Sequence, residues 1–214
     1  MRLLKTRKII VFIAMCAICL YVHAYNHVKK VLILKLVDTG KSKRFNEMKD
    51  SIVLDFTFRD TLNRPVRISD FRGKFVFIDL WYSGCGECIV ANKALRIVHE
   101  KLKNENILFL SISVDSCREK WIESITNNAL PTKIDPWAGK YYPARGTIIL
   151  NTGSSGYDNE FIKRYNPGNG YPKLMFVDPS GKLVSDHPPR PDYSGEDKPQ
   201  ELIDFLSGYL KKHS

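Results

Sequence analysis

Two cysteines three residues apart, Cys85 and Cys88, carry the clearest chemistry in this sequence. They follow the apolar run Phe75–Trp81 and a short turn, residues 82–84, so a buried strand, a turn and a helix are expected in that order. Two cysteines on the first turn of a helix can close a small disulfide, and the helix dipole stabilises a thiolate there. The spacing therefore predicts thiol–disulfide exchange, with Cys85 as an exposed nucleophile and Cys88 as the thiol that resolves a mixed disulfide.

A metal site is the other chemistry open to such a pair. A zinc site would need a second pair of ligands. Residues 51–214 contain no other pair of cysteines or histidines at ligand spacing. Cys117 is the remaining cysteine of this region, and it is expected to be a free thiol rather than a third redox cysteine. The sequence predicts neither a metal nor another cofactor.

The first 24 residues have the pattern of a targeting segment. Residues 1–8 contain four basic side chains, residues 9–22 are apolar and uncharged, and a cleavage site follows with Ala24 at its end. This pattern favours a secretory signal peptide, because a bilayer span needs about 20 apolar residues. An uncleaved membrane anchor is the alternative. Neither Cys16 nor Cys19 follows a small residue, which argues against a lipid-modified cysteine. With either segment, the rest of the chain is expected outside the cytoplasm, in the periplasm or cell envelope.

The net charge of the chain is +10, and part of it lies in the first eight residues and in residues 29–44. Residues 25–50 are therefore expected to form a basic linker that can lie against anionic lipid. The basic residues show no repeated interleaving with aromatic residues, so no nucleic-acid partner is expected. Residues 51–214 are enough for one domain with its own apolar core.

The sequence on both sides of the cysteine pair predicts the elements that hold it in place. Residues 52–58 and 66–68 are typical of an N-terminal β-hairpin. Apolar residues at helical spacing after Cys88 predict an amphipathic helix. Residues 107–114 form the next apolar run, and a strand, a helix and a second strand in this order predict a parallel pair with Phe75–Trp81.

The second half of the sequence is expected to complete a three-layer α/β arrangement. Its predicted elements are a helix at residues 119–128, a short strand at 147–150 and a short helix at 159–165. Residues 173–177 and 182–185 flank turn residues 178–181, which predicts an antiparallel hairpin. Pro199 marks the start of a C-terminal amphipathic helix.

Residues 75–88 resemble the active-site segment of thioredoxin-like proteins. The residues before them are similar to the extracytoplasmic TlpA/ResA branch, which is related to the AhpC/TSA peroxiredoxins. The matching positions there are Phe56, Asp60, Val66, Ile68, Asp70-Phe71 and Gly73-Lys74. A second matching segment, residues 171–182, holds in this family a cis-proline that faces the disulfide, which would be Pro172 here. Over residues 51–212 the resemblance implies a thioredoxin fold, with α/β/α layers, a central mixed sheet and an N-terminal β-hairpin.

Three positions depart from the pattern of that family. The family usually has tryptophan before the first cysteine, where this chain has Gly84, and proline before the second, where it has Glu87. Tyr171 replaces the small or β-branched residue that more often precedes the cis-proline. Such positions tune the redox potential and the choice of partner, so they leave the direction of electron flow open. Trp81 matches the aromatic residue of the family motif and is expected to pack beside the disulfide.

Two acids are expected to tune the cysteines. Asp79 lies within the apolar strand, six residues before Cys85, where thioredoxins often carry a buried acid. Burial raises the pKa of a carboxyl, which suits a proton acceptor for the resolving thiol. A turn-capping aspartate at the strand end is the alternative. Glu87 is favoured at the N-terminus of a helix, but its charge opposes a neighbouring thiolate.

The resemblance implies an extracytoplasmic thiol–disulfide oxidoreductase that works without a cofactor. Because both acids favour a reducing potential, the expected role is to reduce the disulfides of client proteins such as apocytochromes, with electrons from a membrane or periplasmic donor. Two alternatives stay open. One is a peroxidase of the AhpC/TSA kind, although no PxxxTxxC frame surrounds the cysteine pair. The other is a copper- or haem-delivery protein that uses the two sulfurs as ligands.

Overall fold

The computed structural model describes residues 22–23, 25–30, 51–126, 140–191 and 198–213. The chain divides into two compact units, residues 1–48 and residues 49–214. In the first unit, the described residues 22–23 and 25–30 are helical and exposed, whereas most of the predicted targeting segment and linker lies outside the described residues. No helix in the described ranges is both long and apolar enough to cross a bilayer.

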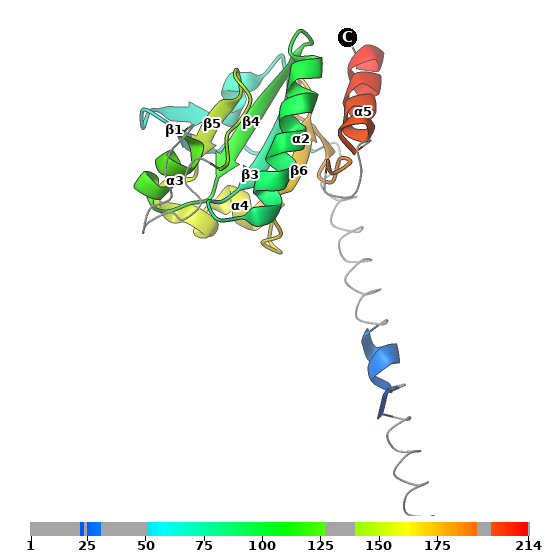
Figure 1. Cartoon of the computed structure of the whole chain (residues 1–214). Helices are drawn as coiled ribbons and strands as arrows, with labels where there is room; N and C mark the ends of the chain where they lie inside the picture. The colour runs from blue at the N-terminus through cyan, green and yellow to red at the C-terminus, as the bar shows by residue number, and fades with distance from the viewer. Residues whose placement is uncertain (1–21, 24, 31–50, 127–139, 192–197, 214) are drawn as a thin grey trace, which may run out of the picture. The chain divides into compact units, whose positions relative to one another are not determined.

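A seven-stranded mixed sheet forms the centre of the second unit, in the order β2-β1-β5-β4-β3-β6-β7 (Figure 1). Its strands are β1 (Thr57–Asp60), β2 (Pro65–Arg67), β3 (Phe75–Trp81), β4 (Ile107–Ser113), β5 (Ile148–Asn151), β6 (Lys173–Val177) and β7 (Leu183–Ser185). Strands β3, β4 and β5 are parallel, and the other pairings are antiparallel. The predicted parallel pairing of β3 with β4, the strands before and after the helix that follows the cysteines, is therefore confirmed. The strand that leads to the cysteines, β3, lies between β4 and β6.

Both predicted hairpins are present at the two edges of the sheet. In the first, β1 pairs with β2 so that Phe58 lies opposite Val66. This strand begins at Thr57 rather than at Ile52 as predicted, and Ile52 instead forms an isolated bridge with Lys182. The reason is local: the carboxylate of Asp55 accepts hydrogen bonds from the backbone and side chain of Ser69, which replace a strand ladder there. The second hairpin joins β6 and β7.

In the described residues, four helices and two short 3-10 segments accompany the sheet. They are α2 (Gly86–Leu102), α3 (Arg118–Ile125), α4 (Glu160–Tyr165), α5 (Lys198–His213), η1 (Ile68–Phe71) and η2 (Gly153–Asp158). Helices α2 and α5 lie side by side over one face of the sheet (Figure 1). Their apolar positions, among them Leu95 and Leu206, join one buried cluster with Phe75 and Phe77 of β3.

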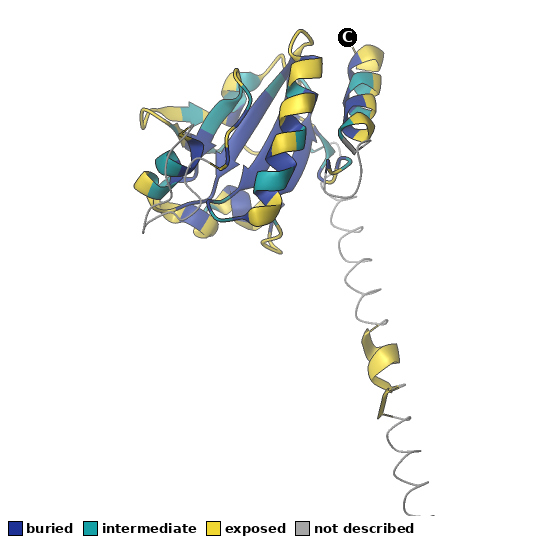
Figure 2. Ribbon diagram, viewed as in Figure 1, coloured by how far each residue is buried: buried dark blue, intermediate teal, exposed yellow. Residues whose placement is uncertain are grey.

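The opposite face of β3 is also covered. Val76, Ile78 and Leu80 point away from the α2 and α5 cluster and are buried, so the strand is dark blue along its length in Figure 2. The ring of Phe161, from α4, packs edge-on against that of Phe58 in β1. A strand buried on both faces needs apolar residues at almost every position, which explains the continuous apolar run before the cysteines. The predicted α/β fold with a central mixed sheet and an N-terminal hairpin is confirmed.

Candidate active site

The two cysteines form a disulfide at the N-terminus of α2, with 5.2 Å between their Cα atoms. Cys85 is the N-cap residue of the helix, and its sulfur accepts a hydrogen bond from the backbone N–H of Cys88 at 3.1 Å. This N–H is one of the donors that a helix leaves unpaired at its first turn. When the disulfide is reduced, the same donor and the helix dipole are in place to stabilise a thiolate on Cys85.

An aromatic cluster covers the disulfide. Cys85 is 4 % exposed and Cys88 is fully buried, so the expectation of an exposed nucleophile is wrong for the oxidised protein. The cover comes from residues far apart in the sequence, which is why the local pattern did not predict it. Its members are Trp81, Trp121, Ile125 and Tyr141, with Tyr82, Ile89, Ile122, Ile149 and Tyr171 packed against them. Trp81 therefore lies beside the disulfide, as predicted.

The turn before Cys85 is held by a buried aspartate that the sequence analysis missed. Asp115, just after β4, accepts hydrogen bonds from the backbone N–H of Ser83 at 2.9 Å and from its hydroxyl at 2.6 Å. The hydroxyl of Ser113 donates a third, at 2.6 Å. The carboxyl ends of the neighbouring parallel strands β3 and β4 lie at the same edge of the sheet, and this placement was the signal that could have found Asp115.

Gly84 occupies the position where the family usually has tryptophan. Its φ of 81° lies in the left-handed region, which glycine adopts without steric cost. A tryptophan there would be strained in this backbone conformation. The departure from the family pattern is therefore tied to the shape of this turn.

Asp79 lies in the middle of the sheet, on β3, and is buried. One carboxylate oxygen accepts a hydrogen bond from the hydroxyl of Tyr141 at 2.5 Å, and the other has no hydrogen-bond partner in the described structure. Burial raises the pKa of Asp79 to about 7, although the hydrogen bond from Tyr141 and the charge of Arg190 both act to lower it. The alternative of a turn cap at the strand end is wrong, because Asp79 pairs within the ladders to both β4 and β6.

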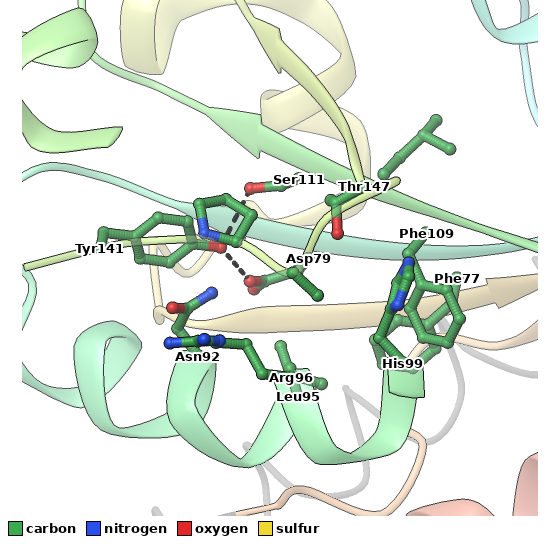
Figure 3. Close-up of a pocket in the computed structure, with 13 residues that line it drawn as sticks. Phe77, Asp79, Asn92, Leu95, Arg96, His99, Phe109, Ser111, Tyr141 and Thr147 are labelled. Carbon is green, nitrogen blue, oxygen red and sulfur yellow. Dashed lines mark hydrogen bonds between the residues drawn. The ribbon is translucent and has the colours of Figure 1, made fainter. Parts of the chain in front are cut away.

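Tyr141 links this acid to the disulfide region. Its ring stacks on that of Trp81, with centroids 3.5 Å apart and planes within 5°. Its hydroxyl also lies 3.0 Å from the hydroxyl of Ser111, which is the β4 neighbour of Asp79 (Figure 3). Burial and the nearby Asp79 hold the pKa of Tyr141 well above its usual range, so the phenol stays protonated and acts as a donor. Tyr141 belongs to a loop segment without a periodic pattern, so no sequence signal pointed to it.

A small pocket reaches the buried acid. It is lined by Asp79, Tyr141, and residues of α2 that include Asn92, Arg96 and His99 (Figure 3). Its volume of about 20 Å³ is room for one water molecule. Because one oxygen of Asp79 has no hydrogen-bond partner among the described residues, a water in this pocket could bond to it and exchange protons with solvent.

The segment before β6 supplies the predicted proline. The peptide bond between Tyr171 and Pro172 is cis, as predicted. Tyr171 packs against the cluster that contains both cysteines, which brings this segment to the active site. Its ring also meets those of Tyr82 and Tyr157 edge-on, with centroids 5.4 Å and 5.9 Å away. Three tyrosines thus lie together at the mouth of the site.

Glu87 is exposed on the first turn of α2, but it is not a lone charge. Its carboxylate lies 3.0 Å from the guanidinium of Arg190, which comes from the loop after β7. The sequence analysis treated the charge of Glu87 as uncompensated and missed Arg190. That inference is corrected by the ion pair.

Cys117 stands at the N-cap position of α3 as an exposed free thiol, as predicted. Its sulfur contacts the carboxylate of Glu119 at 3.4 Å. In the described part of the chain, no three His, Cys, Asp or Glu side chains come together in a way that could hold a metal ion.

Comparison with solved structures places the fold among thioredoxin-like proteins. A thioredoxin domain of a thiol-disulfide oxidoreductase from Bacteroides vulgatus is 20 % identical with a TM-score of 0.53, covering 76 % of this chain and 97 % of its own. A thiol-disulfide oxidoreductase from Bacteroides fragilis is 22 % identical with a TM-score of 0.52, covering 76 % and 98 %. A thiol:disulfide interchange protein from a Bacteroides species is 20 % identical with a TM-score of 0.53, covering 76 % and 90 %.

These similarities concern the fold, and the family is given by a sequence model. The model of the AhpC/TSA family matches residues 50–185, a segment that contains the hairpin, both cysteines, Asp79 and Pro172. The predicted relationship to thioredoxin-like proteins of this group is confirmed. The chain therefore belongs to the AhpC/TSA family and has the thioredoxin fold.

Proposed function

We propose that the protein is an extracytoplasmic thiol–disulfide oxidoreductase that reduces disulfides of client proteins through Cys85 and Cys88. The observation that carries this proposal is the disulfide at the N-cap of α2, with a buried, partly unpartnered carboxyl of raised pKa behind it. The solved neighbours named thiol-disulfide oxidoreductases support the reaction class. No cofactor takes part in the reaction.

The reaction begins with the reduced pair. The Cys85 thiolate attacks one sulfur of a client disulfide, a mixed disulfide forms, and the other client sulfur leaves as a thiolate. Cys88 then loses its proton and attacks the sulfur of Cys85, which releases the second client sulfur and closes the Cys85–Cys88 disulfide. The client has gained two electrons and, with protons from the surroundings, two thiols. A dithiol donor returns the two electrons to the pair.

Asp79 is the proposed proton acceptor for Cys88. Asn92, which lines the same pocket as Asp79, lies one turn beyond Cys88 on α2, and Tyr141 contacts both the acid and the cysteine cluster. A carboxyl with a pKa of about 7 is ionised for half of the molecules at neutral pH. It can therefore accept a proton from the resolving thiol and pass it to solvent through the pocket.

Pro172 and Tyr171 are proposed to bind the client. An extended client segment beside the disulfide can hydrogen-bond to the backbone next to Pro172, in the manner of a strand added to an edge. The tyrosines Tyr82, Tyr157 and Tyr171 offer an apolar surface with polar tips around that segment.

A peroxidase is the second function that the family assignment suggests. Such a reaction needs a cysteine that meets a small peroxide, with threonine and arginine to polarise it. Here the first cysteine is already paired with a partner three residues away, and no threonine frame surrounds it. Oxidation of the reduced protein by hydrogen peroxide is therefore expected to be no faster than that of an ordinary thiol with the same fraction of thiolate.

Three cysteine variants test the proposal. Cys85→Ser should abolish the reduction of insulin, because the nucleophile is lost, and Cys88→Ser should accumulate mixed disulfides with clients, because the resolving attack is lost. The matched control is Cys117→Ser, which should keep at least half of the wild-type rate. Wild-type turnover in Cys85→Ser would contradict the proposal.

Location is a separate part of the proposal and has its own test. It rests on the basic and apolar pattern of residues 1–24. Alkaline phosphatase fused after Lys49 should be active, because that enzyme needs disulfides that form outside the cytoplasm. An inactive fusion would contradict the extracytoplasmic assignment, and the intact mass of the exported protein shows whether residues 1–24 are removed.

A further inference from the structure

Arg190, from the loop after β7, forms an ion pair with the first turn of the active-site helix α2. The guanidinium of Arg190 is 3.0 Å from the carboxylate of Glu87, which stands between the two cysteines, although 103 residues separate the pair in the sequence. Glu87 is in the first turn of α2, where Cys85 is the N-cap. The cation is therefore held against a residue of the same helical turn on which a thiolate forms when the disulfide is reduced.

The loop that carries Arg190 is fixed at its start by a buried ion pair. Asp186 lies 3.2 Å from the ammonium group of Lys173, and both side chains are 9 % exposed. Lys173 follows the cis-proline and pairs with Leu80 of β3 in the sheet. This anchor ties residues 186–191 to the same strands that position the cysteines.

Prolines make the rest of this loop stiff. Pro188, Pro189 and Pro191 surround Arg190, and a proline ring fixes φ near −65°. Pro188 and Pro191 are also buried, so they pack against the domain rather than follow the solvent. A long arginine side chain on a mobile loop would lose much entropy on pairing, and a fixed loop lowers that cost. The stiff loop thus restricts the guanidinium of Arg190 to a position near Glu87.

The charge of Arg190 changes the electrostatic environment at the N-terminus of α2. Without Arg190, the carboxylate of Glu87 would repel a thiolate on Cys85 and oppose the helix dipole that favours it. With Arg190, that charge is compensated. The same cation also favours the ionised form of Asp79, whose pKa it acts to lower. One side chain thus acts on both acids that the sequence analysis singled out.

We propose that Arg190 is a tuning residue of the redox pair: it neutralises Glu87 and thereby stabilises the reduced form. The inference rests on the proposed function. Reduction adds two electrons and one proton to the disulfide, which gives a thiolate on Cys85 and a thiol on Cys88, and a thiol reductant supplies the electrons. Arg190 acts through its ion pair with Glu87, so its effect is expected in the redox equilibrium and in the pKa of the Cys85 thiol.

The test is an equilibrium with glutathione in low salt, for the wild type and the variants Arg190→Gln, Glu87→Gln and the double variant. Arg190→Gln leaves Glu87 uncompensated, so the equilibrium constant for reduction should fall about threefold, which corresponds to about 14 mV. Glu87→Gln leaves the arginine uncompensated and should raise the constant by about the same factor. The double variant should lie near the wild type, and Arg190→Lys should restore most of the constant.

A second readout separates tuning from a merely structural effect. The pKa of the Cys85 thiol, followed by thiolate absorbance, should rise in Arg190→Gln and fall in Glu87→Gln. Both shifts should shrink at high salt, because the pair is exposed. The matched control is Arg64→Gln, which removes the same charge from an exposed ion pair with Asp60 at the β1–β2 hairpin and should change neither quantity.

Failure of the proposed function and failure of the role of Arg190 give different results in these experiments. If the wild-type pair does not exchange with glutathione at all, the proposed function fails. If the wild type exchanges and Arg190→Gln shows the wild-type constant and thiol pKa, only the role of Arg190 is overturned. Shifts of the same sign in Arg190→Gln and Glu87→Gln would also overturn it.

Discussion

Two buried aspartates serve the cysteine pair from neighbouring strands, and they are held in opposite ways. Asp115, after β4, accepts three hydrogen bonds from Ser83 and Ser113. Asp79, within β3, accepts one from Tyr141 and has an oxygen without a hydrogen-bond partner in the described structure. A buried carboxyl with few hydrogen-bond donors, such as that of Asp79, has a raised pKa and can take up a proton.

Burial alone therefore does not mark a reactive acid. Asp115 shapes the turn that presents Cys85, and its carboxylate is used up in that task. The carboxyl of Asp79 accepts a single hydrogen bond, from Tyr141, among the described residues. Its pKa of about 7 keeps both protonation states accessible. The number of donors around each carboxylate, rather than its exposure, separates the structural acid from the one proposed to move a proton.

The largest expected effect is on the pH dependence of stability at Asp79. Its pKa is raised from 3.8 to about 7, so the folded state holds a proton that the unfolded state has lost between these pH values. Stability therefore falls as pH rises from about 4 to about 7 and is flat above. Asp79→Asn removes this penalty, and its free energy of unfolding relative to wild type should rise over that window by up to about 4 kcal/mol.

Urea unfolding of the oxidised proteins at several pH values measures this effect. Any fixed cost of burying the amide of Asn cancels, because only the change with pH is compared. A difference between Asp79→Asn and wild type that stays constant from pH 4 to pH 8 would show that Asp79 has an ordinary pKa.

The next effect is on Asp115. Asp115→Ala leaves the N–H and hydroxyl of Ser83 and the hydroxyl of Ser113 without their buried acceptor. Each such group costs about 1–3 kcal/mol, and water can partly replace the lost acceptor, so a loss of about 3 kcal/mol in the free energy of unfolding is expected. Denaturation at pH 7 measures it. The control Asp158→Ala, at an exposed ion pair, should cost less than about 0.5 kcal/mol, and an equally small loss in Asp115→Ala would break the comparison.

A smaller effect sharpens the account of Asp79. Tyr141→Phe keeps the ring that stacks on Trp81 and removes the hydroxyl that donates to the carboxylate. Because that hydrogen bond favours the ionised acid, its loss should raise the pKa of Asp79 by about one unit. The upper end of the window in which stability falls should move up equally. A window that stays in place would mean that the hydroxyl has no influence on the acid.

Local signals predicted much of this site. The cysteine spacing and the acid inside an apolar strand singled out Cys85, Cys88 and Asp79, and the resemblance to thioredoxin-like proteins supplied the cis bond at Pro172. The apolar runs predicted the central strands for the same reason, because a strand buried on both faces has a simple pattern.

What the sequence did not predict depends on contacts between distant segments. Tyr141 reaches Asp79 from 62 residues away, Asp115 reaches Ser83 from 32, and Arg190 reaches Glu87 from 103. Tyr141, Asp115 and Arg190 each lie in a loop, where the sequence has no helical or strand periodicity that could reveal such a contact. The cover over Cys85 was missed for the same reason, because its rings come from several elements that only the fold brings together.

The redox potential of the Cys85–Cys88 pair decides whether the protein acts as a reductant. The ionised form of Asp79 beside the site repels a thiolate, and the charge of Arg190 is paired with that of Glu87. Equilibration of the purified domain with dithiothreitol and glutathione buffers, with the Cys85–Cys88 state read by alkylation and mass, gives the value. We expect it to be nearer to about −270 mV, as in thioredoxin, than to about −120 mV, as in DsbA. A value above about −180 mV would contradict the reductant assignment and indicate disulfide formation or isomerisation instead.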